Sequence, residues 1–485
     1  MVQTDVKLFP HVTEEMVSDI TGFKLDAFLI ALEGWRRGLK LKWYKDESNL
    51  CELHRLNSST QGKFFSLRSN DNTHYFFRSR GDKVANKSVN ICNDKEKTKD
   101  ILASKGVPVP QGKIFKVNDK EAITYASNIG YPVVIKPLKG SMGRGVYTNI
   151  QNEDELKNAI EDFRSRFKKY TEFAVEKHYP GKEYRIYVVG DQVVGATNRI
   201  PANVIGDGKT SITNLIKNKN KERKKNPYLA PKPIKVDYEV RHLLKQAGYD
   251  ENSIPPKGEQ VFLREKSNLS SGGDPIEATD ELSEEVKQLA VDALKSLPSI
   301  PHAGVDIIVD PISKKKGVVL EANGTAEIAF HLFPLSGKAR DVPSAVIDYY
   351  FPETVNTEKS NFYFDYKSIL EPLKTWAVNE IEISSSPSGS LYGRKFIASG
   401  KVQKVGYMNW IRRQALKRNL NGYSKKLGDN KIEIVVVGTN QKDVDDFLER
   451  CYVGSKKSKV DSVDEQRFQI KKPFKIGFEI ITDKK

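Results

Sequence analysis

The sequence has few of the residues and patterns that mark secreted or membrane proteins. Its 485 residues include only three cysteines, Cys51, Cys92 and Cys451, whose spacing is not that of a disulfide framework or a CxxC metal knuckle. Apolar runs such as residues 434–437 stop well short of the roughly 18 residues of a membrane span. The first residues lack the basic patch and apolar stretch of a secretory signal. We therefore expect a cytoplasmic protein with no membrane segment.

Acidic residues are also fewer than basic ones. The chain has 63 Asp and Glu against 79 Lys and Arg, which gives a net charge of +16. Most of the excess lies in residues 391–485, where 22 basic residues accompany 11 acidic ones. Such a surface suits an anionic partner, including nucleic acid. Tyr407, Trp410 and Tyr423 have rings that stack on bases in other proteins, but core packing accounts for them better, so nucleic-acid binding is not favoured.

Length and patterning indicate several domains. At about 100–200 residues per domain, the chain has room for roughly two to four. Residues 1–92 are predicted to form a small α+β domain, and helices and strands alternate over residues 93–353. Residues 354–390 are predicted to be a connector with a short helix, and residues 391–485 begin a new pattern of strands and helices. The expected fold class is therefore a multi-domain α+β protein.

Periodicity predicts the elements around the first candidate site. Apolar residues at helical spacing predict a helix over 26–37. An Asn-Asp-Asn turn between two apolar runs predicts a β-hairpin over 62–80. The next predicted elements are a polar helix that begins at Asp94, a strand at 113–115, a helix at 119–128, a strand at 132–136 and, in the connector, a helix near 366–376.

A glycine-rich loop follows the strand that ends at Lys136. The loop contains Gly140, Ser141, Met142, Gly143 and Gly145. Glycines let the backbone approach an anion closely and offer N–H groups to phosphate oxygens. The spacing matches neither GxxxxGK[ST] nor GxGxxG. On the loop alone, a phosphate-binding loop and a surface hairpin are equal alternatives.

Two apolar strands further along carry oxygen-bearing side chains. Asp306 lies in GVDIIVD, and Glu321 and Asn323 lie in VVLEAN. A buried carboxylate is unfavourable unless it is paired or binds a cation. Oxygen ligands suit Mg²⁺, which bridges nucleotide phosphates. These three residues are therefore predicted magnesium ligands.

Taken in order, these segments resemble the ATP-grasp superfamily. The runs NRIPANVIGDGKTSITNLI (198–216) and VFLREKSNLSSGGDPIEATDEL (261–282) are similar to the ligase region of cyanophycin synthetases. They are equally similar to the glutathione synthetase half of bifunctional glutathione-forming enzymes, and residues 90–112 fit both families. The resemblance covers about residues 88–352. It implies an ATP-grasp fold and an ATP-dependent ligase, in which an amino-acid or peptide carboxylate becomes an acyl phosphate and an amine converts it to an amide.

The resemblance also implies cofactors and a set of nucleotide-binding residues. The implied cofactors are ATP and two Mg²⁺ ions, with Mn²⁺ as the alternative. The implied nucleotide contacts are Lys95 and Lys136 to the phosphates, the loop from Gly140 to Gly145 as a lid, Glu176 in the adenine pocket and Glu183 at the ribose. The metal ligands that it implies are the three residues predicted above.

Two arginines lie inside the best-matching runs. Arg199 and Arg264 are predicted to neutralise the transferring phosphoryl group or to hold the acceptor carboxylate, with a surface ion pair as the alternative. The predicted substrate-binding residues are Arg185, Asn203, Ser271, Gly272 and Gly273, the last three through backbone N–H groups. His331 and Arg340 are further candidates, and a packed interior position is an equal alternative for His331.

Two features depart from the family pattern or extend it. The family's Glu-x-Asn-x-x-Pro run reads Glu-Ala-Asn-Gly-Thr-Ala at 321–326, so the substrate-facing loop is expected to differ. The basic insert at 218–235 is interpreted as a solvated loop, with a dock for an acidic co-substrate as the alternative.

Residues 391–485 resemble an acylphosphatase domain, which implies a ferredoxin-like βαββαβ fold. The resemblance rests on GKVQKVGYM at 400–408 and LNGY at 420–423. In that family an arginine grips the phosphate and an asparagine orients the water. Met408 and Lys426 stand at these positions, and Lys404 replaces a loop glycine. The domain is therefore predicted to lack phosphatase activity while still offering a basic surface to an anionic partner, with a stabilising appendage as the alternative.

Two alternatives to a ligase stay open. The first is a non-catalytic ATP-binding or scaffold protein on a degenerate ligase fold, which would be expected to have lost some of the predicted nucleotide and metal residues. The second is a protein that binds an anionic partner through its basic C-terminal domain. The resemblance also leaves homo-oligomerisation open, because relatives often form dimers or tetramers.

Overall fold

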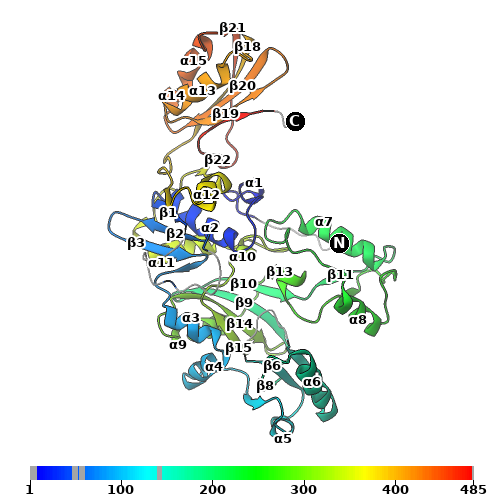
Figure 1. Cartoon of the computed structure of the whole chain (residues 1–485). Helices are drawn as coiled ribbons and strands as arrows, with labels where there is room; N and C mark the ends of the chain where they lie inside the picture. Colours follow the sequence, from blue (N-terminus) through cyan, green and yellow to red (C-terminus); the bar gives the residue numbers. More distant parts are fainter. Residues whose placement is uncertain (1–7, 46–52, 54–59, 139–144, 483–485) are drawn as a thin grey trace.

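The computed structural model of the protein describes residues 8–45, 53, 60–138 and 145–482. Within them the strands form six sheets (Figure 1). The C-terminal sheet and its helices stand apart from the rest at the top of that view, while the remaining sheets form the body of the molecule. In the described part of the chain no helix has both the length and the apolar character to cross a membrane.

The N-terminal domain is a five-stranded antiparallel sheet in the order β17-β1-β2-β3-β4, packed against the helix α2 (Phe23–Arg36). The strands are β1 (Lys40–Tyr44), β2 (Phe64–Arg68), β3 (Thr73–Phe77), β4 (Arg80–Gly81) and β17 (Glu380–Glu382). A short helix, α1 (Glu14–Val17), precedes α2. The structure thus contains the predicted helix and the predicted hairpin, whose turn is closed by a hydrogen bond from the Ser69 N–H to the Asn72 carbonyl.

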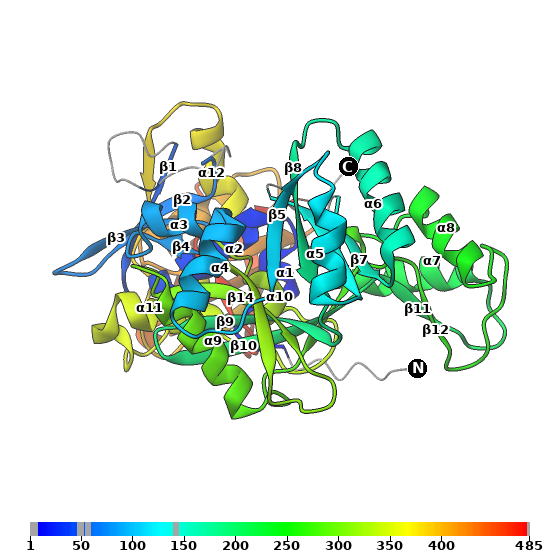
Figure 2. The same ribbon diagram turned by 90° about the horizontal axis from the view of Figure 1, so that it is seen from below.

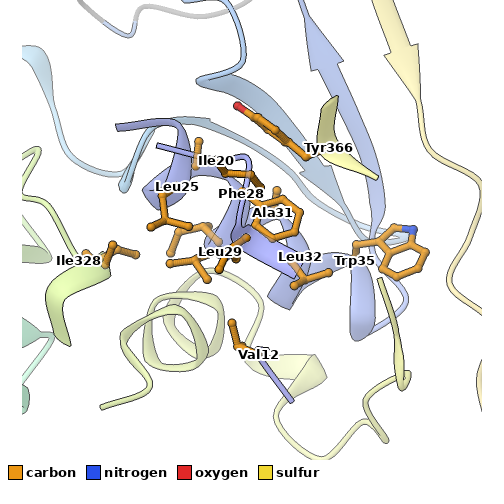
Figure 3. Packing of buried hydrophobic residues seen from close by; sticks show 14 of the residues in the cluster. Val12, Ile20, Leu25, Phe28, Leu29, Ala31, Leu32, Trp35, Ile328 and Tyr366 are labelled. Atoms are coloured by element: carbon orange, nitrogen blue, oxygen red, sulfur yellow. The ribbon is translucent and has the colours of Figure 1, made fainter. Parts of the chain in front are cut away.

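Helix α2 lies in the interior, because apolar residues occupy nearly all of its faces. Phe28 packs edge-on against the Tyr366 ring, and Ile328 lies on the Leu25 side of the helix, so α2 contacts residues from distant parts of the chain (Figure 3). The same helix also buries the carboxylate of Asp26, which is 1% exposed. A charge in such a helix needs compensation.

Much of the predicted connector packs into this core. Helix α12 (Tyr366–Lys374) lies within the predicted range, but β17 pairs with β1, and β16 (Phe362–Tyr363) leads into α12. Phe362, Phe364 and Leu373 are each at most 1% exposed. The buried apolar residues between 362 and 383 are therefore part of the N-terminal domain's core, and this segment is not a linker.

The central sheet is antiparallel and carries most of the predicted site residues. Its order is β13-β10-β9-β14-β15, formed by β9 (Lys182–Val189), β10 (Gln192–Ile200), β13 (Asp274–Glu277), β14 (His302–Val309) and β15 (Gly317–Asn323). Helix α9 (Glu284–Ser296) covers one face, while α10 (Ala329–Leu332) and α11 (Val342–Tyr350) contact β9 and β10. A single turn, η2 (Pro352–Thr354), follows α11.

A second, smaller sheet lies beside α4, as Figure 2 shows. Its order is β5-β8-β6-β7, formed by β5 (Gly112–Lys116), β6 (Val133–Pro137), β7 (Tyr147–Ile150) and β8 (Glu172–Lys177). It is packed with α5 (Glu121–Ile129) and α6 (Glu153–Arg166). Helices α3 (Asn86–Asn93) and α4 (Lys95–Ser104) contact β15 of the central sheet. Asp94 caps α4 through the Lys97 N–H, so the helix begins where the sequence predicts.

A small subdomain follows β10. It contains the two-stranded ribbon of β11 (Asn203–Ile205) and β12 (Gln260–Phe262), with helices α7 (Ile212–Arg223) and α8 (Tyr238–Gln246). The turn η1 (Leu269–Ser271) returns the chain to β13. The subdomain lies at the right of Figure 1, away from α3 and α4.

The C-terminal domain has the predicted ferredoxin-like order of elements. They are β18 (Tyr392–Lys401), α13 (Tyr407–Leu416), β19 (Asn421–Lys426), β20 (Lys431–Gly438), α14 (Gln441–Asp445), α15 (Phe447–Val453), β21 (Lys459–Arg467) and β23 (Phe478–Ile481). The sheet order is β21-β18-β20-β19-β23. Between β21 and β23, the short strand β22 (Phe474–Lys475) pairs in parallel with β16, which connects this domain to the N-terminal one.

Candidate functional site

The register of the central sheet brings three charged residues into one row. Asp306 on β14 pairs with Arg185 on β9 and with Glu321 on β15. Directly opposite residues on adjacent strands have neighbouring side chains. The sequence predicts a magnesium role for two of these residues and a substrate role for the third, and the fold places all three together.

Asp306 is held by two arginines. Both Arg185 and Arg199 donate to its carboxylate, and the Nη2 atoms lie 2.8 Å and 2.7 Å from Oδ2. Asp306 is 2% exposed. Burial by itself would raise its pKa, but the ion pairs with Arg185 and Arg199 hold the pKa well below its usual range. The carboxylate is therefore ionised and compensated by protein cations.

Glu321 lies at the open side of this row. Its Oε2 is 3.3 Å from Lys95 Nζ, its Oε1 is 3.6 Å from Arg185 Nη2, and Asn323 donates to Oε1 at 3.1 Å. The predicted metal ligands are thus neighbours. Among the described residues, however, no group of three or more His, Cys, Asp or Glu could hold a metal ion. A metal role for Asp306, Glu321 and Asn323 stays a prediction.

Glu183 extends the network toward the small subdomain. It accepts a hydrogen bond from Arg199 and another, at 2.6 Å, from Ser267 Oγ. Arg199 therefore bridges Glu183 and Asp306. The predicted ribose contact and a predicted catalytic arginine are direct partners in this structure.

A second cluster belongs to the smaller sheet. Glu176 on β8 is 3% exposed, and its two oxygens each lie 2.6 Å from a lysine, Lys136 on β6 and Lys99 on α4. Burial would raise the pKa of Glu176, but Lys136 and Lys99 hold it below its usual value. Burial lowers the pKa of Lys136 despite its carboxylate partner. Glu176, predicted in the adenine pocket, is thus paired with the predicted phosphate-binding Lys136.

Lys99 is absent from the predicted set. The sequence spacing could have predicted it, because Lys99 lies four residues after Lys95 on α4 and so shares its helix face. Lys95 faces Glu321 and Lys99 faces Glu176, so one helix links the two clusters.

Most of the predicted lid lies outside the described residues. Gly140, Ser141, Met142 and Gly143 belong to that part. Gly145 is described and has a φ of +72°, which favours glycine. A Cβ atom there would lie 3.3 Å from the Phe163 ring.

Arg264 lies in another part of the structure. It is ion-paired with Asp237 at 2.5 Å and with Glu239, both at the start of α8. These partners belong to the small subdomain, whereas Arg199 is bound to the central sheet. The structure therefore separates the ion pairs of the two predicted catalytic arginines.

The loop Ser271–Gly273 does not offer the predicted N–H donors. The N–H groups of Ser271 and Gly273 bond to the Asn268 carbonyl, and that of Gly272 bonds to the Leu269 carbonyl. The prediction of backbone donors is wrong because the turn η1 uses them internally. Gly272 is required by the turn, with a φ of +100° and Ile234 close by.

Asn203 belongs to a cluster centred on Asp274. Its amide donates to Asp274 Oδ2 at 3.0 Å, and Lys219 and Arg223 pair with the same carboxylate at 2.5 Å and 2.9 Å. Arg223 also donates to the Gly273 carbonyl. Lys219 and Arg223, which belong to both the basic insert and α7, thus face the interior of the protein rather than the solvent.

The two further candidates have structural partners. His331 is fully buried and lies 3.1 Å from the Thr197 hydroxyl, and burial lowers its pKa to about 3. Arg340 pairs with Glu277 at 2.9 Å and with Asp280 at 2.6 Å. The interior alternative for His331 is therefore the one that the structure supports.

In the C-terminal domain, Met408 packs against the domain's apolar core. Lys404 has a φ of +56°, in the region that glycine favours. Lys426 is exposed at the end of β19. The thioether at the arginine position cannot donate hydrogen bonds to an anion.

Family comparisons match two separate parts of the chain. Residues 92–222 match the family described as a RimK-like ATP-grasp domain, and residues 394–480 match the acylphosphatase family. The first match contains the three lysines of the two clusters and Arg199, while Asp306 and Glu321 lie beyond its end. The second coincides with the ferredoxin-like domain.

Two curated proteins and one solved structure are each similar to part of this chain. The cyanophycin synthetase of Trichormus variabilis is 38% identical over 56% of this chain and 30% of its own length. The glutathione biosynthesis bifunctional protein GshAB of Clostridium perfringens is 33% identical over 54% of this chain and 34% of its own length. A solved bifunctional glutathione synthetase from Pasteurella multocida is 30% identical, with 62% of this chain and 41% of that chain covered and a TM-score of 0.48. The chain thus matches about a third of the length of these curated relatives.

Proposed function

Because the chain carries a RimK-like ATP-grasp domain followed by an acylphosphatase domain, we propose that it is an ATP-dependent ligase that joins a carboxylate to an amine. In the proposed reaction a substrate carboxylate attacks the γ-phosphorus of ATP, and ADP leaves. The amine then attacks the resulting acyl phosphate, and phosphate leaves as the amide forms. The observation that carries the proposal is the charge network of Lys95, Glu321, Arg185, Asp306, Arg199 and Glu183.

This chemistry needs positioned charge rather than a protein nucleophile. Lys136 and Lys95 would bind the nucleotide phosphates, and Lys99 joins them in this proposal. Arg185 and Arg199 would neutralise the phosphoryl oxygens, since a guanidinium fork suits a tetrahedral anion. Asp306 fixes both forks by binding them at once. Fixed donors of this kind stabilise a developing charge without having to reorganise.

The proposal includes two Mg²⁺ ions, with Mn²⁺ as the alternative. The donors fit in part: Glu321 and Asn323 present oxygens of the kind that magnesium binds, and the Glu321 side chain is 29% exposed. Asp306 is already satisfied by two arginines, so its role as a ligand requires these arginines to give up a bond. When bound, the metal would screen the negative charge of the phosphates.

The substrate class is proposed from the relatives' names. We propose amino acids or peptides as the carboxylate and the amine, which is the class that the resemblance to cyanophycin and glutathione synthetases implies. In this proposal residues 93–353 are the ligase domain and residues 391–485 are an accessory domain. An anionic partner of the accessory domain, a homo-oligomer and a cytoplasmic location all stay predictions.

An ADP-release screen tests the proposal. Full-length protein with Mg²⁺ and ATP is incubated with pairs of amino acids and dipeptides, and products are identified by mass spectrometry. We expect at least one pair to release ADP and to yield an amide of the summed mass less water. ATP binding without ADP release from any pair would favour the non-catalytic scaffold instead.

The acylphosphatase domain is predicted to be inactive in the full-length protein. Benzoyl phosphate should be hydrolysed no faster with the protein than in buffer, because Met408 supplies no donor for the phosphate. Phosphate release is the measurement. Hydrolysis that disappears in a Lys404→Ala variant would contradict the prediction, since it would locate turnover in the β18–α13 loop.

A further inference from the structure

A buried carboxylate without a full set of partners lies where the N-terminal domain meets the loop after β15. Asp26 Oδ1 accepts the N–H groups of Ile328 and Ala329 at 3.0 Å and 3.1 Å. Its other oxygen, Oδ2, is buried and has no hydrogen-bond partner among the described residues. The nearest cation is Arg78, whose Nη2 lies 3.9 Å away. Asp26 is 1% exposed, and a buried carboxylate oxygen without a donor is unfavourable.

A second carboxylate lies next to the first. Glu327 precedes the residues that bind Asp26, and it accepts a hydrogen bond from the Tyr228 hydroxyl at 2.7 Å. Its other oxygen is 3.4 Å from Lys232 Nζ. Burial, and then the charge of Glu327, raise the pKa of Asp26 to about 7. A cation between the two carboxylates would relieve both the burial and the repulsion.

Arg78 supplies the opposite charge. Its φ of +60° is unusual for a residue with a side chain, and strain of this kind often accompanies functional sites. The guanidinium stacks on the Phe23 ring at 3.4 Å from the centroid. Its Nε is buried without a hydrogen-bond partner among the described residues. The junction therefore contains a free acceptor and a free donor side by side.

The junction adjoins the charge network. The chain runs directly from Asn323 to Glu327, and Ser79 of the N-terminal domain fixes this loop by donating to the Ala326 carbonyl at 2.5 Å. A Cβ atom on Gly304 would contact both the Arg185 side chain and Ala326 Cβ, so both groups lie close to the same face of Gly304. The loop between Asp26 and Arg185 is the one that departs from the family pattern.

We propose that Asp26, Glu327 and Arg78 bind the amine substrate of the ligase, an amino acid or peptide that presents its ammonium and its carboxylate together. The ammonium would lie between the two carboxylates, and the substrate carboxylate would lie at Arg78. This inference rests on the proposed function. It assigns the acceptor site to the buried junction between the N-terminal domain and the ligase domain.

The attack of the amine on the acyl phosphate needs no further reactant. The ammonium gives one proton to Asp26, and the nitrogen lone pair forms the C–N bond at the acyl carbon. The bond from that carbon to the phosphate oxygen breaks, and phosphate leaves with the electron pair. The nitrogen loses its second proton to solvent, and Asp26 returns its proton to solvent as the amide departs.

Hydroxylamine measures the first half-reaction, the formation of the acyl phosphate, independently of the proposed amine site. It converts an acyl phosphate to a hydroxamate without needing an amino-acid site, and the hydroxamate is read as its coloured ferric complex. Wild type, Asp26→Asn and the control Asp341→Asn are compared with ATP, Mg²⁺ and the carboxylates of the ADP-release screen. Like Asp26, Asp341 accepts a backbone N–H group at the start of a helix, here α11, and burial raises its pKa. Asp341 lies outside the proposed site. Asparagine keeps the acceptor for Ile328 and Ala329 and removes only the charge.

We expect all three proteins to form hydroxamate within twofold of one another. The KM for the amine should rise about 100-fold in Asp26→Asn, and in a second variant, Glu327→Gln, but stay unchanged in Asp341→Asn. An unchanged amine KM in Asp26→Asn would overturn the amine site alone. Loss of hydroxamate in that variant would also overturn it, because it would show a general structural role. No hydroxamate from wild type would overturn the ligase proposal and this inference with it.

Discussion

Replacing Asp306 by alanine is expected to lower both the stability and the turnover of the protein. The change leaves Arg185 and Arg199 without the carboxylate that binds both, and their side chains are only 10% and 16% exposed. Removing one partner from a buried ion pair costs about 3–5 kcal/mol in the free energy of unfolding. The proposed phosphoryl contacts lose their fixed geometry as well, so turnover should fall about 100- to 1000-fold.

Thermal unfolding and ADP release measure the two effects. Asp310→Ala is the matched control, because this carboxylate follows the same strand but binds only backbone N–H groups in the hairpin turn. It should retain turnover. An Asp306→Ala protein that is as stable and as active as wild type would show that the arginines do not depend on Asp306.

The stability that Asp306 provides also has a defined pH range. Its pKa is lower in the folded protein than the usual value of about 4. Such a group contributes stability above its unfolded pKa, and the contribution is lost as the pH falls through the folded pKa. The difference in stability between wild type and Asp306→Ala should therefore be largest at neutral pH and should shrink in strong acid.

Replacing Lys136 by alanine is expected to weaken ATP binding by about 100-fold. The Lys136 side chain is 12% exposed and its partner is the buried Glu176. Loss of a buried, hydrogen-bonded charge contact costs roughly 2–5 kcal/mol, and each 1.4 kcal/mol is a factor of ten in affinity. Glu176 would then repel the phosphates with only Lys99 beside it.

Titration calorimetry with ATP and Mg²⁺, in the absence of other substrates, measures this effect. Lys113→Ala is the control, because Lys113 lies on the neighbouring strand β5 and its side chain is 58% exposed. Its ATP affinity should equal that of wild type. An unchanged affinity in Lys136→Ala would remove Lys136 from the nucleotide site.

The sequence predicted much of the architecture because the patterns are local. Helix α4 begins at its Asp94 cap, and the hairpin of β2 and β3 turns at its Asn-Asp-Asn run. The β18–β21 order follows the acylphosphatase resemblance. The connector was different: its polar flanks suggested a linker, while the apolar residues between them complete a core that begins more than 300 residues earlier.

Most residues of the site could be predicted from the sequence, but the ion pairs that they form could not. Burial of Asp306 was expected, and a compensating cation with it, yet that cation is supplied by Arg185 and Arg199 from strands more than 100 residues away. Only the sheet register brings them together. Ser271–Gly273 were predicted as donors because they lie in a run that resembles the ligase families, but their N–H groups bond within the turn.

Asp26 is also unusual in the sequence. A carboxylate in the apolar run FKLDAFLIALEGW is unusual for a buried helix, and it indicates either a partner or a ligand. Its surroundings come from Arg78 and from residues 327–329, which the N-terminal sequence cannot reveal. The fold was needed to show that the second oxygen lacks a donor.

The central claim is that a carboxylate is activated as an acyl phosphate. The most direct measurement uses a substrate carboxylate labelled with ¹⁸O, taken from the pair that releases ADP, and mass spectrometry of the products. The account predicts ADP as the nucleotide product and one ¹⁸O atom in the inorganic phosphate, because a carboxylate oxygen stays with phosphorus when the amine attacks. Unlabelled phosphate, or AMP carrying the label, would contradict it.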